Sequence, residues 1–131
     1  MSVSRSELRE KIMTILYQVE MYEKNKYEYK LDSVIKENID ITSEFVNNIV
    51  NGVLENKETL DEKANKYLTD WTIDRLDNLG ATILRMGLYE ILYTDTPDVV
   101  VINEAIELAK KYSDDNVKKM INAVLDKIIN E

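Results

Sequence analysis

The sequence predicts an all-α fold of six to seven helices, packed as two small bundles that share one core. The 131 residues contain only three glycines and one proline, too few for the many turns of a β fold. Apolar residues recur at steps of three and four, the spacing of amphipathic helices. In the last segment these residues are Val117, Met120, Ile121, Val124, Leu125 and Ile128. A chain of this length suits a single domain with a real core.

The first helix is predicted to begin at Ser4, with Glu7 completing a capping box, and to fray near residues 24–25. Residues 25–40 are the least regular part, although Leu31, Val34 and Ile35 indicate a short helix. A third helix follows a cap within residues 40–43 and reaches about Asn56, and a short fourth one ends near Leu68. The third and fourth helices are each expected to have an apolar face turned toward the core. The expected core positions of these two helices are Phe45, Val46, Ile49, Val50, Val53, Leu60, Ala64, Tyr67 and Leu68.

Residues 69–72 are the expected seam between sub-bundles of about 1–69 and 70–131, with Trp71 packing across it. A long helix then starts near Asp77 and runs to about Tyr93. Gly80 and Gly87 are seven residues apart and therefore share a face, which favours close approach of another helix.

Thr96 is the expected cap of the next helix, with Pro97 at its first position. Residues 99–102 are the one stretch where a strand is conceivable, but no pairing partner is evident. Residues 113–116 are expected to form the turn and cap before the last helix.

The residue types restrict the chemistry. Cysteine and histidine are both absent, which excludes disulfides, thiol or histidine catalysis and the usual zinc sites. No phosphate-binding glycine motif is present. We therefore expect no enzyme activity, no cofactor and no metal. No uncharged apolar run approaches the ~20 residues that span a bilayer, and no secretory signal is evident, so a cytoplasmic protein is expected.

Two sets of polar residues need an explanation. Arg85, Glu90, Asn103 and Glu104 stand among apolar neighbours, where buried ion pairs and capping bonds are far commoner than a catalytic carboxylate pair. The second set is a basic stripe on the first helix, formed by Arg5, Arg9 and Lys11. From these residues alone, an ordinary solvated face is the preferred interpretation, because Glu7 and Glu10 are interleaved with them.

Three blocks carry a family resemblance. The segments ILRMGLYEIL, TPDVVVINEAIELAKKYS and MINAVLDKI are similar to the C-terminal half of the NusB family of bacterial transcription antitermination factors. LREKIMTILYQVE resembles that family's first helix. The similarity spans essentially the whole chain and is weaker between residues 25 and 67.

The resemblance implies an RNA-binding role. In that family an arginine-rich first helix contacts boxA RNA, which implies this role for Arg5 and Arg9, with Lys11 beside them; Ser6 and Glu7 stand where arginine is frequent. The start of the last helix meets the RNA next to it. There the resemblance implies contacts from Asn116, Lys119 and Asn122.

The resemblance also implies protein partners. Tyr17 and Gly80 fall on or near the surface that the family offers to NusE, a ribosomal protein, within the RNA polymerase antitermination complex. A net charge of −8 favours help from a basic partner, because phosphate neutralisation drives most RNA affinity. The alternative is a non-enzymatic interaction or homodimerisation module without RNA affinity, and the sequence leaves monomer and homodimer open.

Overall fold

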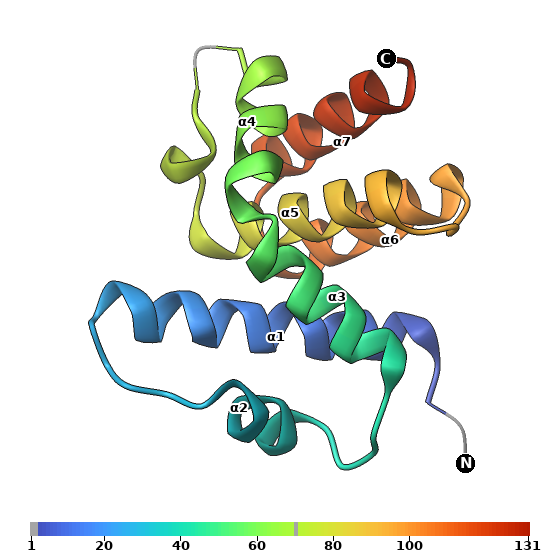
Figure 1. Cartoon of the computed structure of the whole chain (residues 1–131). Coiled ribbons are helices and arrows are strands. Elements are labelled where there is room, and N and C mark those ends of the chain that lie inside the picture. Colours follow the sequence, from blue (N-terminus) through green and yellow to red (C-terminus); the bar gives the residue numbers. More distant parts are fainter. Residues whose placement is uncertain (1–2, 70) are drawn as a thin grey trace. The chain divides into compact units, whose positions relative to one another are not determined.

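The computed structural model describes residues 3–69 and 71–131, and these contain seven α-helices, one 3₁₀ turn and no strand (Figure 1). The elements are α1 (Arg5–Lys24), α2 (Leu31–Asn38), α3 (Glu44–Glu55), α4 (Lys57–Tyr67), η1 (Ile73–Arg75), α5 (Asn78–Tyr93), α6 (Asp98–Tyr112) and α7 (Asp115–Ile129). The predicted all-α fold is confirmed. The valine-rich residues 99–102 are helical and belong to α6.

Backbone contacts divide the chain into an N-terminal unit, residues 1–51, and a C-terminal unit, residues 52–131. The boundary lies inside α3 and not at residues 69–72, because α4 packs against α5 and α7 and so belongs with the second unit. Trp71 is 44% exposed and does not fill a seam. Asp70, within the expected seam, lies outside the described residues.

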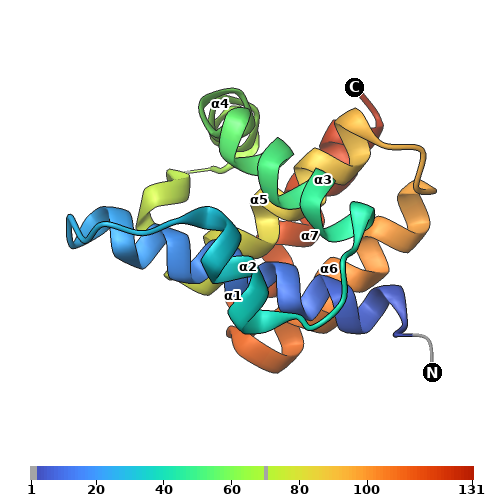
Figure 2. The ribbon, with the colours of Figure 1, turned by 60° about the horizontal axis from the view of Figure 1, so that its bottom comes forward.

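The N-terminal unit is built on α1. Its predicted cap is confirmed: Ser4 Oγ accepts a hydrogen bond from the backbone N–H of Glu7 at 3.1 Å and donates to that residue's carboxylate. The short helix expected from the apolar spacing is α2, which lies beside α1 (Figure 2). Asn38 Nδ2 links the two helices by donating to Gln18 Oε1 at 2.8 Å. The buried apolar residues of this unit are Leu8, Ile12, Met13, Ile15, Leu16, Val19, Val34, Val46, Ile49 and Val50.

The C-terminal unit is built on contacts among α5, α6 and α7, with α4 against α5 and α7. The close approach predicted at the two glycines is confirmed. A Cβ atom on Gly80 would lie 2.6 Å from Val117 Cγ1, and one on Gly87 would lie 3.0 Å from Leu125 Cδ1. Both contacted residues belong to α7. The absence of a side chain at these two positions therefore sets how near α7 comes to α5.

The start of α6 differs from the prediction. Pro97 is the residue before the helix, and its carbonyl accepts from the N–H groups of Val100 and Val101 at 3.0 and 3.1 Å. Thr96 is thus one residue too early to cap it, and its N–H donates to Thr94 Oγ1 at 3.3 Å.

The predicted buried polar set is correct only in part. Arg85 and Glu90 are buried, and Arg85 forms a two-pronged pair with Asp61 through Nε–Oδ1 at 2.7 Å and Nη2–Oδ2 at 3.1 Å. Asn103 is exposed and Glu104 is half-buried. The apolar spacing of α6 turns Val101, Ala105, Leu108 and Ala109 toward the core, which leaves Asn103 on the solvent side.

Candidate nucleic-acid interface

Two arginines of α1 share one aromatic ring in the N-terminal unit. Arg5 and Arg9 are one helical turn apart, and their guanidinium carbons lie 4.6 and 5.1 Å from the centre of the Phe45 ring. Phe45, at the first turn of α3, is half-buried. A guanidinium over an aromatic face is attracted by the ring quadrupole and loses some of its freedom to move. Phe45 therefore holds Arg5, which stays exposed, in a defined position beside the capped start of α1.

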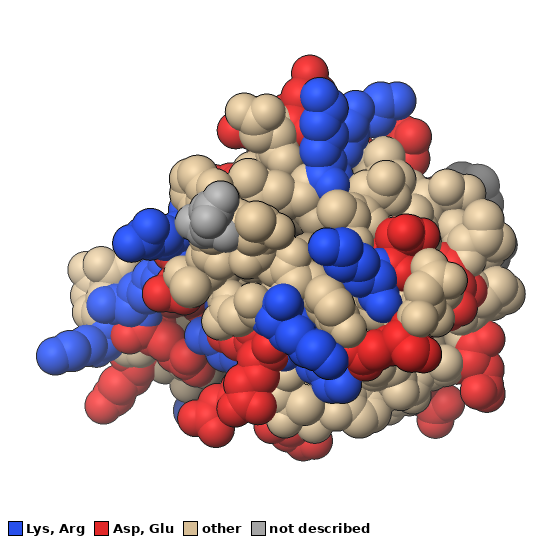
Figure 3. All heavy atoms as spheres, turned by 90° about the horizontal axis from the view of Figure 1, so that it is seen from above, with Lys and Arg blue, Asp and Glu red and all other residues tan. Residues whose placement is uncertain are grey.

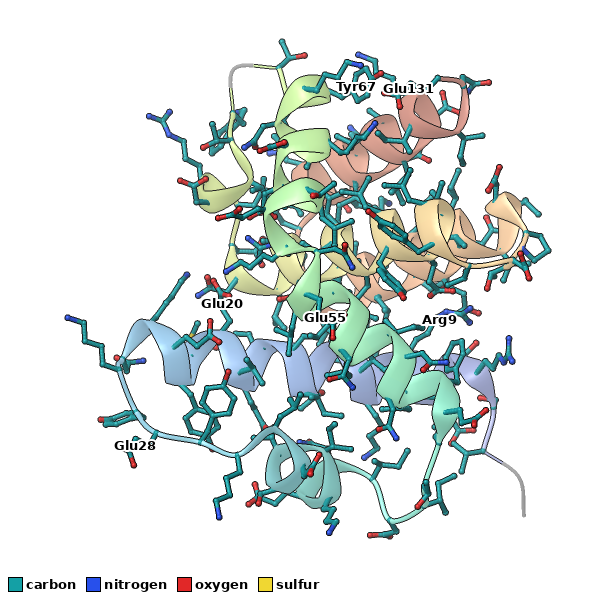
Figure 4. All side chains as sticks on the ribbon, viewed as in Figure 1. Arg9, Glu20, Glu28, Glu55, Tyr67 and Glu131 are labelled. Carbon is teal, nitrogen blue, oxygen red and sulfur yellow. The ribbon has the colours of Figure 1, made fainter. Side chains whose placement is uncertain are left out.

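Arg9 and Lys11 do not extend this exposed position. Arg9, labelled in Figure 4, is only 3% exposed, and its guanidinium lies on the ring of Phe45. Lys11 is exposed, but a two-residue step turns it by about 200° around the helix from Arg9. The three residues therefore do not form a continuous surface stripe.

The start of α7 presents a polar face in the C-terminal unit. Asp114 caps the helix by accepting from the N–H of Val117 at 2.9 Å, as the predicted turn required. Three-residue steps place Asn116, Lys119 and Asn122 on the side away from the buried stripe, and all three are exposed. The structure thus brings these three predicted residues together on one helix.

The start of α7 is also tied to the start of α5. Ser113 Oγ donates to Asp77 Oδ1 at 2.9 Å, while Asp77 Oδ2 accepts from the N–H of Gly80. One carboxylate thus caps α5 and holds the turn before α7, which fixes the place of the polar face within this unit.

The two residues expected to meet a protein partner differ in accessibility. Tyr17 is half-buried on α1 and keeps part of its ring at the surface. Gly80 is buried beneath Val117, so it packs against α7 and is not available to a partner. Its seven-residue spacing from Gly87 already indicated packing and was the more reliable signal.

A cluster that the sequence did not reveal joins α4 to Glu131. Lys63 Nζ and Lys66 Nζ lie 3.2 Å from Glu131 Oε1 and Oε2, and the Tyr67 hydroxyl donates to Oε2 (Figure 4). The hydrogen bond from Tyr67 and those from the two lysines lower the pKa of Glu131 to about 2, and the bond from Tyr67 has the largest effect. The pKa of Lys66 is raised, by its contact with Tyr67 and then by Glu131. Glu131 is more than sixty residues away in sequence from the α4 residues that it contacts, so no local sequence pattern predicts the cluster.

On the face in Figure 3, basic and acidic side chains lie side by side, and neither sign covers it continuously. Among residues 3–69 and 71–131, no group of three acidic side chains is placed to hold a metal ion. Within the same ranges, no helix has both the length and the apolar character required to cross a membrane.

Comparison with known proteins identifies the family. The chain is 45% identical over 127 residues to the transcription antitermination protein NusB of Staphylococcus aureus strain JH9, covering 96% of this chain and 98% of the relative. The protein of strain N315 matches to the same extent.

Solved structures agree with this assignment. The T. maritima NusB structure covers 100% of this chain and 94% of its own, with a TM-score of 0.87 and 29% identity. A structure described as antitermination factors NusB and NusE in complex with dsRNA has the same fold, with a TM-score of 0.80, 24% identity and 96% coverage of both chains. The family model for NusB matches residues 6–130. This chain belongs to the NusB family.

Proposed function

We propose that this protein is an RNA-binding transcription antitermination factor that pairs with NusE to bind a boxA element of nascent ribosomal RNA. The observation that carries the proposal is the 45% identity, along 96% of the chain, to a protein named as a transcription antitermination factor. The protein would act in the cytoplasm by holding RNA close to RNA polymerase, with no chemical step of its own.

The RNA contacts would come from two exposed polar segments. Arg5 offers a guanidinium that Phe45 already holds in place, so less side-chain entropy is lost on binding a phosphate or a base edge. Lys119 offers a mobile ammonium, and Asn116 and Asn122 offer amides that hydrogen-bond sugars or bases. Arg9 supports the site by holding Phe45, and Lys11 adds only long-range attraction.

The net charge favours binding of RNA together with a basic partner. With 17 basic and 25 acidic residues, the chain as a whole repels RNA, and only local groups attract it. A basic protein bound to the acidic surface would reverse this balance and raise the affinity. NusE is the proposed partner, and Tyr17 the proposed contact on this chain, because an aromatic ring that is partly exposed suits a protein interface.

Fluorescence anisotropy tests this function. A labelled boxA RNA would be titrated with the protein alone and with the protein premixed with NusE, at two salt concentrations. We expect the mixture to bind more tightly, and its affinity to fall steeply as salt rises. Absence of binding in both titrations would reject RNA recognition and leave the interaction or homodimerisation module, which sedimentation of the same samples would identify.

A further inference from the structure

We propose a second RNA contact on the C-terminal unit, in which Lys63, Lys66 and Tyr67 bind a backbone phosphate and the side chain of Glu131 competes with it. This inference rests on the proposed RNA-binding function, but it concerns residues outside the two segments described above. Glu131 already occupies the site as an anion, so it marks where an RNA phosphate would bind.

The geometry resembles that of an oxyanion site. Two ammonium groups lie 3.2 Å from the two carboxylate oxygens of Glu131, and the Tyr67 hydroxyl donates to one of them. Lys63 and Tyr67 are separated by four residues, and Lys66 adjoins Tyr67, so one helix, α4, presents all three donors. A phosphate group carries several acceptor oxygens and could receive the same three hydrogen bonds.

The charge of the cluster exceeds what one carboxylate neutralises. Besides Lys63 and Lys66, Lys127 Nζ lies 5.9 Å from the centre of the Tyr67 ring, and Lys66 Nζ lies 5.1 Å from it. Lys66 and Lys127 thus lie over the Tyr67 ring, and Lys63 and Lys66 contact the Glu131 carboxylate. Figure 3 looks onto this side of α4 and the end of α7, where basic side chains stand among acidic ones. An incoming anion would therefore meet the ammonium groups of Lys63, Lys66 and Lys127 at this cluster, although acidic side chains lie elsewhere on the same face.

The competing carboxylate is displaceable. The Lys63, Lys66 and Glu131 side chains are 38%, 59% and 29% exposed, so water and solutes reach the site. Ion pairs in such positions hold weakly, because solvent screens them. A polyanion that brings several phosphates at once would displace a single side chain.

RNA fits the site better than an acidic peptide does. Lysines gathered around an aromatic ring are typical of surfaces that bind single-stranded nucleic acid, where the cations follow the backbone and the ring stacks on a base. A carboxylate-bearing peptide would use the cations but not the Tyr67 ring. The contact is with the backbone, so it should not depend on the RNA sequence.

The test compares the wild-type protein with Glu131→Gln, which removes the competing charge and keeps the shape. The probe is a labelled uridine oligonucleotide, which lacks boxA, titrated at low salt and followed by anisotropy. We expect Glu131→Gln to bind it about two- to fivefold more tightly, the range for an exposed ion pair. Adding Lys63→Gln and Lys66→Gln should abolish this gain in affinity. It should also reduce the slope of log affinity against log salt concentration by about 0.7 for each lysine removed.

Two controls make the outcome decisive. Asp126→Asn removes another exposed acid of α7, which accepts from Asn130 and has no ion pair with these lysines among the described residues, and it should leave the affinity close to that of the wild type. A poly-aspartate peptide tests the other class of anion. The inference would be overturned if Glu131→Gln and the wild type bound the oligonucleotide with equal affinity, or if neither bound it detectably. It would also be overturned if Glu131→Gln bound the peptide, but not the oligonucleotide, more tightly than the wild type does. The proposed function is tested separately, by boxA binding with NusE.

Discussion

The guanidinium of Arg5 lies 4.6 Å from the centre of the Phe45 ring, and the buried Arg9 lies on the same ring at 5.1 Å. One phenylalanine from α3 thus organises the start of α1. The exposed arginine has a neighbour that restrains it, while the buried arginine keeps that neighbour in position. Under the proposed function, Phe45 would influence RNA binding by positioning Arg5, without touching the RNA itself.

Replacing Phe45 with leucine should weaken RNA binding and leave the fold intact. Leucine fills much of the same space but has no aromatic face, so Arg5 would lose its restraint. A cation–π contact at an exposed site is worth about 0.5–1 kcal/mol, which corresponds to roughly two- to fivefold in affinity. Anisotropy with boxA RNA and NusE would measure the change, and Phe45→Tyr should restore the affinity. Equal affinity of the leucine variant and the wild type would contradict this role.

Removing Asp61 should destabilise the C-terminal unit. Arg85 is buried, and its two hydrogen bonds to the Asp61 carboxylate balance its positive charge. Breaking a buried pair costs about 3–5 kcal/mol, and the partial exposure of Asp61 reduces this to about 2 kcal/mol. Urea unfolding of Asp61→Ala would measure the loss.

The matched control for that change replaces both partners. Arg85→Met together with Asp61→Leu removes the buried charge along with its counter-ion, so this protein should be more stable than Asp61→Ala alone. A double variant that is less stable than the single one would show that the pair contributes more than charge compensation.

Tyr29 should titrate unusually late. Its hydroxyl donates to Glu23 Oε1 at 2.6 Å, and this bond, together with burial and the negative charge of Glu23, raises the tyrosine pKa to about 12. Because the pKa of Tyr29 is higher in the folded protein than its ordinary value, the hydrogen bond to Glu23 contributes its full stabilisation of the fold below about pH 10. This contribution is lost as the pH rises toward 12. Ultraviolet absorbance of tyrosinate would follow the titration.

Glu23→Gln removes the negative acceptor, so the pKa of Tyr29 should return toward its ordinary value. The matched control is Glu28→Gln, which removes an exposed acid next to Tyr29 on the connection between α1 and α2. It should leave the pKa of Tyr29 high. An unchanged titration in Glu23→Gln would contradict the proposed cause.

The sequence predicts local features well. The caps at Ser4, Asp77 and the turn before α7 depend on residues three positions apart, and the apolar stripes depend on steps of three and four. The glycine pair on α5 indicated close helix packing because two small residues on one face leave room for a neighbour. All of these signals lie within one helix or one turn, so a single sequence contains them.

The candidate site is predicted less well, because its decisive contacts join distant segments. The sequence predicts an exposed basic residue at Arg9, whereas in the structure its guanidinium lies on the ring of Phe45, thirty-six positions later. The family resemblance places Gly80 at a partner surface, whereas in the structure Val117 of α7 packs on it. The cluster around Glu131 likewise needs α4 and the end of α7 to meet. Helix periodicity carries no information about which side chains come together in this way.

The most direct test of the proposed function is boxA binding by the double variant Arg5→Glu with Lys119→Glu, in the presence of NusE. The matched control is Lys36→Glu with Lys110→Glu, which makes the same charge change at exposed positions on α2 and α6. We predict that the first protein loses about tenfold or more in affinity and has a shallower salt dependence, while the control changes little. Equal losses in both proteins would mean that only net charge matters, and they would contradict an RNA site at the starts of α1 and α7.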